Sequence, residues 1–223
     1  MHLTIISGSP RVKKYSNTNK IIAAFKRGVE QAGSTASIYY LTERKSWEAI
    51  RQAFYESQFV LFAFPLFVES LPGIMLEFLE EIDPKQYQGK IKLAFLVHGG
   101  FEEASQLRCC EEYLEVLPGM LQCEYAGTLL KGGTFMLRIT PEKAHQTLEK
   151  AFEQMGESFA RKQKFEKAEV TEFAKPEYYS SAKCKMYNLM MPMEKIMFDR
   201  IAKSQFGCTE PLDARPYEGD RSK

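Results

Sequence analysis

Residues 3–18 read L-T-I-I-S-G-S-P-R-V-K-K-Y-S-N-T, and this stretch decides the fold that the sequence predicts. The apolar run at residues 3–6 is typical of a short buried strand, and the polar end opens a segment with helical periodicity. Backbone N–H groups at a helix N-terminus have no partner within the helix and lie at the positive end of its dipole. The loop between, with Ser, Gly and Arg11, is therefore a candidate anion site. An ordinary strand-to-helix turn capped by Ser or Asn is the alternative.

The loop alone does not define which anion it would hold. It is not a Walker A loop, because no Gly-Lys-Ser/Thr follows Gly8. It is not the dinucleotide fingerprint either, because the second and third glycines of that motif are missing.

Composition and charge narrow the class of protein. The chain has 223 residues, of which 44% are hydrophobic and 26% charged, as in an ordinary globular protein. The net charge of +1 does not favour nucleic acid as a partner, since such proteins usually carry a clustered basic face. No apolar run reaches the about 18 residues of a membrane span, and the first residues do not form a signal peptide, so we expect a cytoplasmic protein. The five cysteines show no metal-ligand spacing, which predicts no metal site.

Strand patterns and helical patterns alternate along the chain. The run F-V-L-F-A-F at residues 59–64 is apolar on both faces, which suits a central parallel strand covered on both sides. Further strands are expected at residues 37–41, at residues 91–97 after Gly89, and within residues 121–129. Helices are expected at residues 17–32, after a cap at Ser46, around residues 75–82, from residue 107 to Pro118-Gly119, and from Thr140 as N-cap with Pro141 in the first turn.

This alternation predicts an α/β fold with a doubly wound parallel sheet. Five strands suggest a flavodoxin-like three-layer sandwich with strand order 2-1-3-4-5, whose ligand lies at the carboxyl ends of the first and third strands. The most irregular loops, rich in Gly and Pro, follow the first, third and fourth strands. We expect these loops to meet at one edge of the sheet, around a flat, phosphorylated ligand.

Two motifs at these strand ends carry a resemblance to a known family. They are Gly8-Ser9-Pro10-Arg11 with Ser16-Asn17-Thr18, and Pro65-Leu66-Phe67 through Ser70-Leu71-Pro72-Gly73. Over residues 3–165 the chain resembles the NADPH-dependent FMN reductase family of flavodoxin-like NAD(P)H oxidoreductases, whose relatives include quinone reductases and iron–sulfur flavoproteins.

The resemblance implies FMN as cofactor and assigns residues to its two ends. In the family the first loop binds the FMN phosphate, which implies that role for Ser9, Arg11, Ser16, Asn17 and Thr18. The second loop would border the isoalloxazine ring, through Pro65, Leu66, Phe67, Val68 and Ser70. The fourth strand would add His98, Gly99, Gly100 and Phe101 beside the ring. For Phe67 a place in the core is the alternative.

Two positions depart from the family pattern. Leu76 and Glu80-Glu81 stand where the family often has a lysine and an Asp-Arg pair. The stretch between residues 41 and 59 contains no cysteine, so an iron–sulfur cluster is not expected.

The implied activity is transfer of hydride from NADPH or NADH to FMN and on to a small acceptor such as a quinone or a flavin, by a homodimer. FMN carries this chemistry, so no catalytic side chain is predicted. His98 as a proton donor is weighed against a plain hydrogen-bonding role. An electron-transfer flavoprotein reduced by a protein partner, and a flavodoxin-like module without enzymatic activity, are the alternatives.

The predicted domain covers residues 1–170, and residues 171–223 form a C-terminal extension. Within it, residues 187–201 are rich in Met and aromatic residues, and a helix through them should kink or start at Pro192. This segment is either a lid or dimer arm over the flavin, or an extra helix packed on its own domain. Residues 211–223 are polar, which predicts a loosely ordered end.

Overall fold

The chain is described from a computed structural model, which covers residues 1–87, 91–210, 214 and 215. The predictions for Gly89 and for most of residues 211–223 lie outside the described residues. The chain divides into two compact units, Met1–Tyr178 and Tyr179–Lys223.

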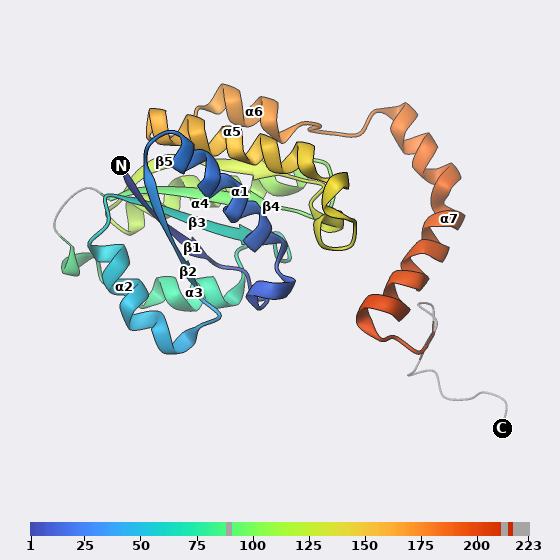
Figure 1. Cartoon of the computed structure of the whole chain (residues 1–223), viewed down its shortest axis with the longest axis horizontal. Helices are drawn as coiled ribbons and strands as arrows, with labels where there is room; N and C mark the ends of the chain where they lie inside the picture. Colours follow the sequence, from blue (N-terminus) through green and yellow to red (C-terminus); the bar gives the residue numbers. More distant parts are fainter. Residues whose placement is uncertain (88–90, 211–213, 216–223) are drawn as a thin grey trace. The chain divides into compact units, whose positions relative to one another are not determined.

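The first unit is built on a five-stranded sheet whose order is β2-β1-β3-β4-β5 (Figure 1). All neighbouring strands are parallel. The sheet order therefore confirms the flavodoxin-like α/β fold. The strands are β1 (His2–Ser7), β2 (Thr35–Tyr40), β3 (Phe59–Pro65), β4 (Lys92–His98) and β5 (Glu124–Lys131).

Helices cover both faces of the sheet because neighbouring strand residues point to opposite sides. Leu61 packs into the cluster of α1 (Asn17–Gln31) and α5 (Gln146–Lys162), and the next residue, Phe62, packs into the cluster of the other face. That other face carries α2 (Trp47–Tyr55), α3 (Gly73–Glu80) and α4 (Ser105–Met120). The short helix α6 (Lys167–Ala174) adds Val170 to one cluster and Ala174 to the other, so it lies along β5, a strand at the edge of the sheet. Short 3-10 helices occupy Lys13–Tyr15, Arg44–Ser46, Pro84–Gln86, Phe135–Arg138 and Glu142–Ala144.

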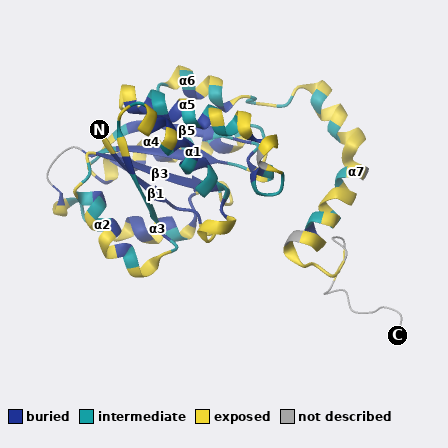
Figure 2. Cartoon of the chain, in the orientation of Figure 1, coloured by how far each residue is buried: buried dark blue, intermediate teal, exposed yellow. Residues whose placement is uncertain are grey.

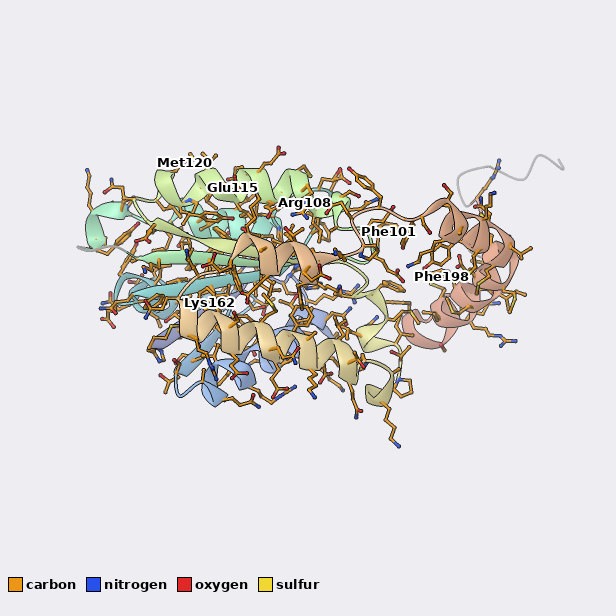
Figure 3. The ribbon with its side chains drawn as sticks, turned by 90° about the horizontal axis from the view of Figure 1, so that it is seen from above. Phe101, Arg108, Glu115, Met120, Lys162 and Phe198 are labelled. Atoms are coloured by element: carbon orange, nitrogen blue, oxygen red, sulfur yellow. The ribbon has the colours of Figure 1, made fainter. Side chains whose placement is uncertain are left out.

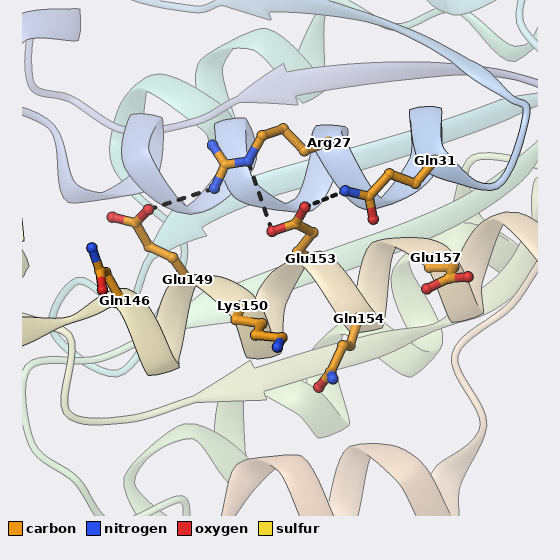
Figure 4. Close-up of a pocket in the computed structure, with 8 residues that line it drawn as sticks. All are labelled: Arg27, Gln31, Gln146, Glu149, Lys150, Glu153, Gln154 and Glu157. Atoms are coloured by element: carbon orange, nitrogen blue, oxygen red, sulfur yellow. Dashed lines mark hydrogen bonds and ion pairs between the residues drawn. The ribbon is translucent and has the colours of Figure 1, made fainter. Parts of the chain in front are cut away.

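Glycines bring α1 and α5 into direct backbone contact. A Cβ placed on Gly28 would lie 1.7 Å from the carbonyl oxygen of Glu153, and one on Gly156 would lie 2.1 Å from that of Phe25. Arg27 pairs with Glu149 and Glu153 at the rim of this contact (Figure 4). A polar groove of about 440 Å³ runs over this rim, on the outer side of the two helices.

Three predicted helix ends are corrected by the structure. Ser46 stands at the N-cap of α2, but its side chain makes no capping hydrogen bond. The helix α4 continues through Pro118-Gly119 to Met120, because a proline in the last turn removes only one intrahelical bond, and Gln122 makes the left-handed turn. Thr140 is not an N-cap: its hydroxyl donates to the Met136 carbonyl at 2.9 Å, and α5 begins at Gln146.

The segment after α6 belongs to the first unit. Arg108 on α4 donates to both carboxylate oxygens of Glu177, at 3.0 and 2.7 Å. This ion pair lowers the pKa of Glu177 below its ordinary value. The predicted division at residue 170 stays a prediction, while the contacts divide the chain after Tyr178.

The second unit contains one long helix, α7 (Ser181–Phe206), which Ser180 caps by accepting from the Lys183 amide at 3.2 Å. The helix does not start at Pro192, because it is continuous across that residue. Many of its Met, Leu and Ile side chains are exposed, as Figure 2 shows. The choice between lid, dimer arm and packed helix stays open. No helix in the described part of the chain is long and apolar enough to cross a membrane.

Candidate functional site

The carboxyl ends of four strands lie together at one edge of the sheet. Ser7 pairs with Ala63 near the end of β3, Pro65 pairs with His98, and His98 pairs with Lys131. The loops that follow are named here the β1 loop (residues 8–16), the β3 loop (66–72), the β4 loop (99–104) and the β5 loop (132–145). Within the first unit, Phe101 of the β4 loop lies at the opposite end from Met120 and Lys162, the last residues of α4 and α5 (Figure 3).

The β1 loop leaves hydrogen-bond donors unused. The hydroxyl of Ser9, which is 3% exposed, accepts from Ser16 at 2.9 Å and from the Arg11 amide at 3.3 Å. Among the described residues its own proton has no acceptor. Ser16 caps α1 by accepting from the Asn19 amide, so the amides of Asn17 and Thr18 remain without intrahelical partners. The arrangement can bind an anion, with the exposed guanidinium of Arg11 nearby in sequence.

The side chain of Asn17 faces the β5 loop. Its Nδ2 donates to the carbonyl of Thr134 at 2.8 Å and lies 3.4 Å from that of Phe135. The opposite amide orientation would place two oxygens together, so the contact fixes which atom is Oδ1. That Oδ1 is buried and has no partner among the described residues. The amide therefore offers an acceptor, which suits a ligand hydroxyl, whereas a phosphate could be met only by the Asn17 backbone N–H.

His98 is enclosed between two threonines. Its Nδ1 lies 2.8 Å from the Thr134 hydroxyl, and its Nε2 lies 2.8 Å from the Thr18 hydroxyl. Burial lowers the pKa of His98 to about 3, so the ring is neutral. The imidazole is 4% exposed, and both nitrogens are engaged. The structure thus places this predicted ring neighbour inside the scaffold that holds the loops.

A tight turn forms the tip of the β3 loop. Phe67 and Ser70 exchange both backbone hydrogen bonds, at 3.0 and 3.2 Å. Val68 and Glu69 between them have positive φ values of 51° and 58°, as a type I′ turn requires. Such a turn normally carries Asn and Gly, and a β-branched residue there is strained. Phe67 is 56% exposed, so the alternative of a core aromatic is excluded.

The β4 and β5 loops are bonded to each other. The Gly99 amide donates to Lys131, the Gly133 amide to Phe101, and the Thr134 amide back to Gly99. A Cβ on Gly132 would lie 2.4 Å from two carbonyl oxygens of the β4 loop, so only glycine fits there.

Gly100 is different, because its surroundings leave room. A Cβ there would meet only Phe135 Cβ, at an ordinary 3.7 Å. The protein's own packing therefore does not explain the glycine. Beside it, Phe101 is 71% exposed.

Sequence reasoning missed Thr134, the centre of this arrangement. The residue is 1% exposed and bonds to Asn17, His98 and Gly99. The available signal was a polar residue directly after Gly132-Gly133 at the end of the fifth strand.

Similar solved structures share the fold. An NAD(P)H:quinone oxidoreductase from Methanothermobacter marburgensis is 13% identical, with a TM-score of 0.55, covering 74% of this chain and 97% of that one. An FMN-dependent NADH-azoreductase from Bacillus anthracis, in complex with FMN, is 13% identical, with a TM-score of 0.52, covering 72% and 100%. The Flv1 flavodiiron core from Synechocystis sp. PCC6803 is 17% identical, with a TM-score of 0.52; the match covers 73% of this chain and 36% of that core.

No family model and no curated protein matches the sequence. Because the structural likenesses lie at such low identity, they establish the fold alone. This chain has a flavodoxin-like α/β fold, with a donor-rich loop at the carboxyl edge of its sheet.

Proposed function

We propose that the chain is an FMN-binding oxidoreductase that takes hydride from NADPH or NADH and passes it to a small acceptor such as a quinone or a flavin. The observation that carries this proposal is a group of hydrogen-bond donors in the β1 loop that have no acceptor among the described residues. They lie at the start of α1, beside the ends of β1 and β3. This is where doubly wound sheets of this order hold their ligands.

The residues present fit the phosphate end of FMN. Ser9 offers a free hydroxyl proton, which Ser16 orients by donating to the same oxygen. The amides of Asn17 and Thr18 and the charge of Arg11 complete a set of donors without a carboxylate among them. The unpaired Oδ1 of Asn17 would accept from a hydroxyl of the ribityl chain.

The residues at the ring end supply an apolar surface and open backbone. Phe67, Val68 and Phe101 are exposed, so their side chains are available to pack against a flat ring. Gly100 leaves free space next to the β5 loop. FMN, when bound, supplies the hydride chemistry, and the role of this chain is to bind, orient and shield it.

Two of the similar structures support the class of reaction. Their printed names describe an NAD(P)H:quinone oxidoreductase and an FMN-dependent NADH-azoreductase. Homodimer formation, which the family resemblance implies, and a cytoplasmic location, which the sequence predicts, complete the proposal. Light scattering of the purified protein would measure the first.

The test is anaerobic reduction of the FMN-loaded protein. The purified chain is mixed with FMN, freed of excess, and titrated with NADPH and NADH while the flavin absorbance is recorded. Bleaching within seconds by either nicotinamide, and recovery on adding a quinone, is the expected result. If FMN binds but neither nicotinamide reduces it, the proposed reductase activity is wrong, and the alternative of an electron-transfer flavoprotein remains. Failure to bind FMN would overturn the proposal entirely.

A further inference from the structure

One pattern of hydrogen-bond directions around His98 satisfies both contacts of the Thr134 hydroxyl. The Thr134 hydroxyl donates to the Gly99 carbonyl at 2.9 Å, and a carbonyl can only accept. The pattern that keeps both contacts of this hydroxyl as hydrogen bonds has Thr134 accepting from His98 Nδ1–H, since its single proton goes to Gly99. A neutral imidazole has only one N–H, so Nε2 is bare and accepts from the Thr18 hydroxyl. The chain of donors thus runs from Thr18 through His98 and Thr134 to Gly99.

This direction separates two hydroxyls that the sequence alone presents as equivalent. The Thr18 hydroxyl donates its proton to His98, while the proton of the Ser9 hydroxyl has no acceptor in the described part of the chain. A phosphate oxygen can be bound by Ser9 but not by the Thr18 hydroxyl, which has only lone pairs to offer. Two acceptors facing each other would repel.

We propose that His98 is a positioning residue of the FMN site: it turns the Thr18 hydroxyl away from the phosphate and bonds the first turn of α1 to the β5 loop. The inference rests on the proposed function. It makes Ser9 the buried side-chain donor that recognises phosphate, and it makes Thr18 and Thr134 members of the scaffold. Their side chains act on any flavin equally, with or without a phosphate.

The experiment compares the affinities for FMN and riboflavin, which differ only in the phosphate. Fluorescence titration gives both dissociation constants for the wild type, Ser9→Ala, Thr18→Val and Thr134→Val. We expect Ser9→Ala to reduce the preference for FMN over riboflavin about tenfold, the loss of one charge-assisted hydrogen bond. Thr18→Val and Thr134→Val should weaken both flavins by the same factor and leave the preference within about twofold of wild type, since neither hydroxyl meets the phosphate.

A second comparison tests the path through His98 itself. In His98→Asn the amide nitrogen replaces Nδ1, so the bond to Thr134 is kept and the bond to Thr18 is lost. For riboflavin, which has no phosphate that a released Thr18 hydroxyl could bind, Thr18→Val should then add nothing in the His98→Asn background, whereas Thr134→Val should still weaken binding. A merely space-filling histidine would make both effects additive.

The outcomes are distinct. A fall in the FMN preference of Thr18→Val comparable to that of Ser9→Ala would overturn the inference while the proposed function stands. A wild type that binds neither flavin would overturn the proposed function itself. Nitrogen NMR of the wild-type ring gives an answer without any flavin: Nδ1 should be protonated and Nε2 bare, and the reverse would contradict the inference even if the His98→Asn variant failed to fold.

Discussion

The side-chain amide of Asn17 donates to the main-chain carbonyl of Thr134 at 2.8 Å, across 117 residues of sequence. Lys20 adds a second link by donating to the Leu137 carbonyl at 2.7 Å. Hydrogen bonds therefore connect the start of α1 to the β5 loop. The Thr134 amide also donates to the Gly99 carbonyl, which connects the β4 loop to them. Three sides of the proposed site form a hydrogen-bonded frame, while the tip of the β3 loop is an exposed turn.

Replacement by alanine should affect FMN affinity at Gly100 and the stability of the fold at Gly132. Gly100→Ala adds a methyl group that the protein tolerates, so stability should change by less than about 0.5 kcal/mol while FMN affinity falls. Gly132→Ala drives a methyl group into two carbonyl oxygens and should cost about 3 kcal/mol or more. Urea unfolding and FMN titration measure both. Unchanged FMN affinity in Gly100→Ala would remove that glycine from the site.

The strained turn at the tip of the β3 loop predicts a gain in stability. Replacing Val68-Glu69 by Asn-Gly supplies the residues that a type I′ turn prefers, and should stabilise the fold by about 1–2 kcal/mol. The urea midpoint should rise with an unchanged slope. The matched control is Val12→Asn in the β1 loop, where φ is not positive and no gain is expected. Equal results for the two variants would show that the turn holds no strain.

The close contact between α1 and α5 predicts a large loss of folding stability when a glycine in it is replaced, but not when a glycine elsewhere is replaced. Gly28→Ala places a Cβ 1.7 Å from a backbone oxygen and should destabilise the fold by about 3 kcal/mol or more. Gly119→Ala, in the last turn of α4 with open space around it, should instead be neutral or stabilise by up to about 1 kcal/mol. Thermal unfolding of both variants gives the comparison. A Gly28→Ala variant as stable as wild type would contradict the observed helix packing.

His98 predicts how stability depends on pH. Its pKa is about 3 in the folded chain against an ordinary 6.5, so between these values the unfolded chain binds one more proton. Its contribution is complete above about pH 6.5 and is lost as the pH falls, with a slope of up to about 1.4 kcal/mol per unit. The difference between wild type and His98→Asn, measured by urea unfolding from pH 7 to pH 4, isolates this slope from the carboxylates common to both. Parallel curves would show that His98 is not buried neutral.

The parallel sheet could be predicted from the sequence because each strand is followed by a helical pattern of its own, and the number of strands suggested the order. The run at residues 59–64 is apolar on both faces, and β3 is indeed covered on both faces. The loop at residues 8–16 was recognisable by its polar residues between a strand and a helix.

What could not be predicted depends on contacts between distant residues. Nothing local to Thr134 shows that Asn17 and His98 will meet it, and nothing local to Thr18 shows which way its proton points. Pro118 was predicted to end a helix because a proline lacks an N–H, but in the last turn the loss of one bond is tolerated. The strain at Val68 likewise follows from its backbone conformation and not from its residue type.

The most direct test of the account is a calorimetric titration of the purified chain with FMN. The account predicts one FMN bound per chain at micromolar or tighter affinity, with Ser9→Ala weakening the binding about tenfold. Riboflavin should bind more weakly than FMN, because it lacks the phosphate that the β1 loop would hold. Absence of FMN binding at millimolar concentration, by a chain whose circular dichroism shows it folded, would contradict the central claim.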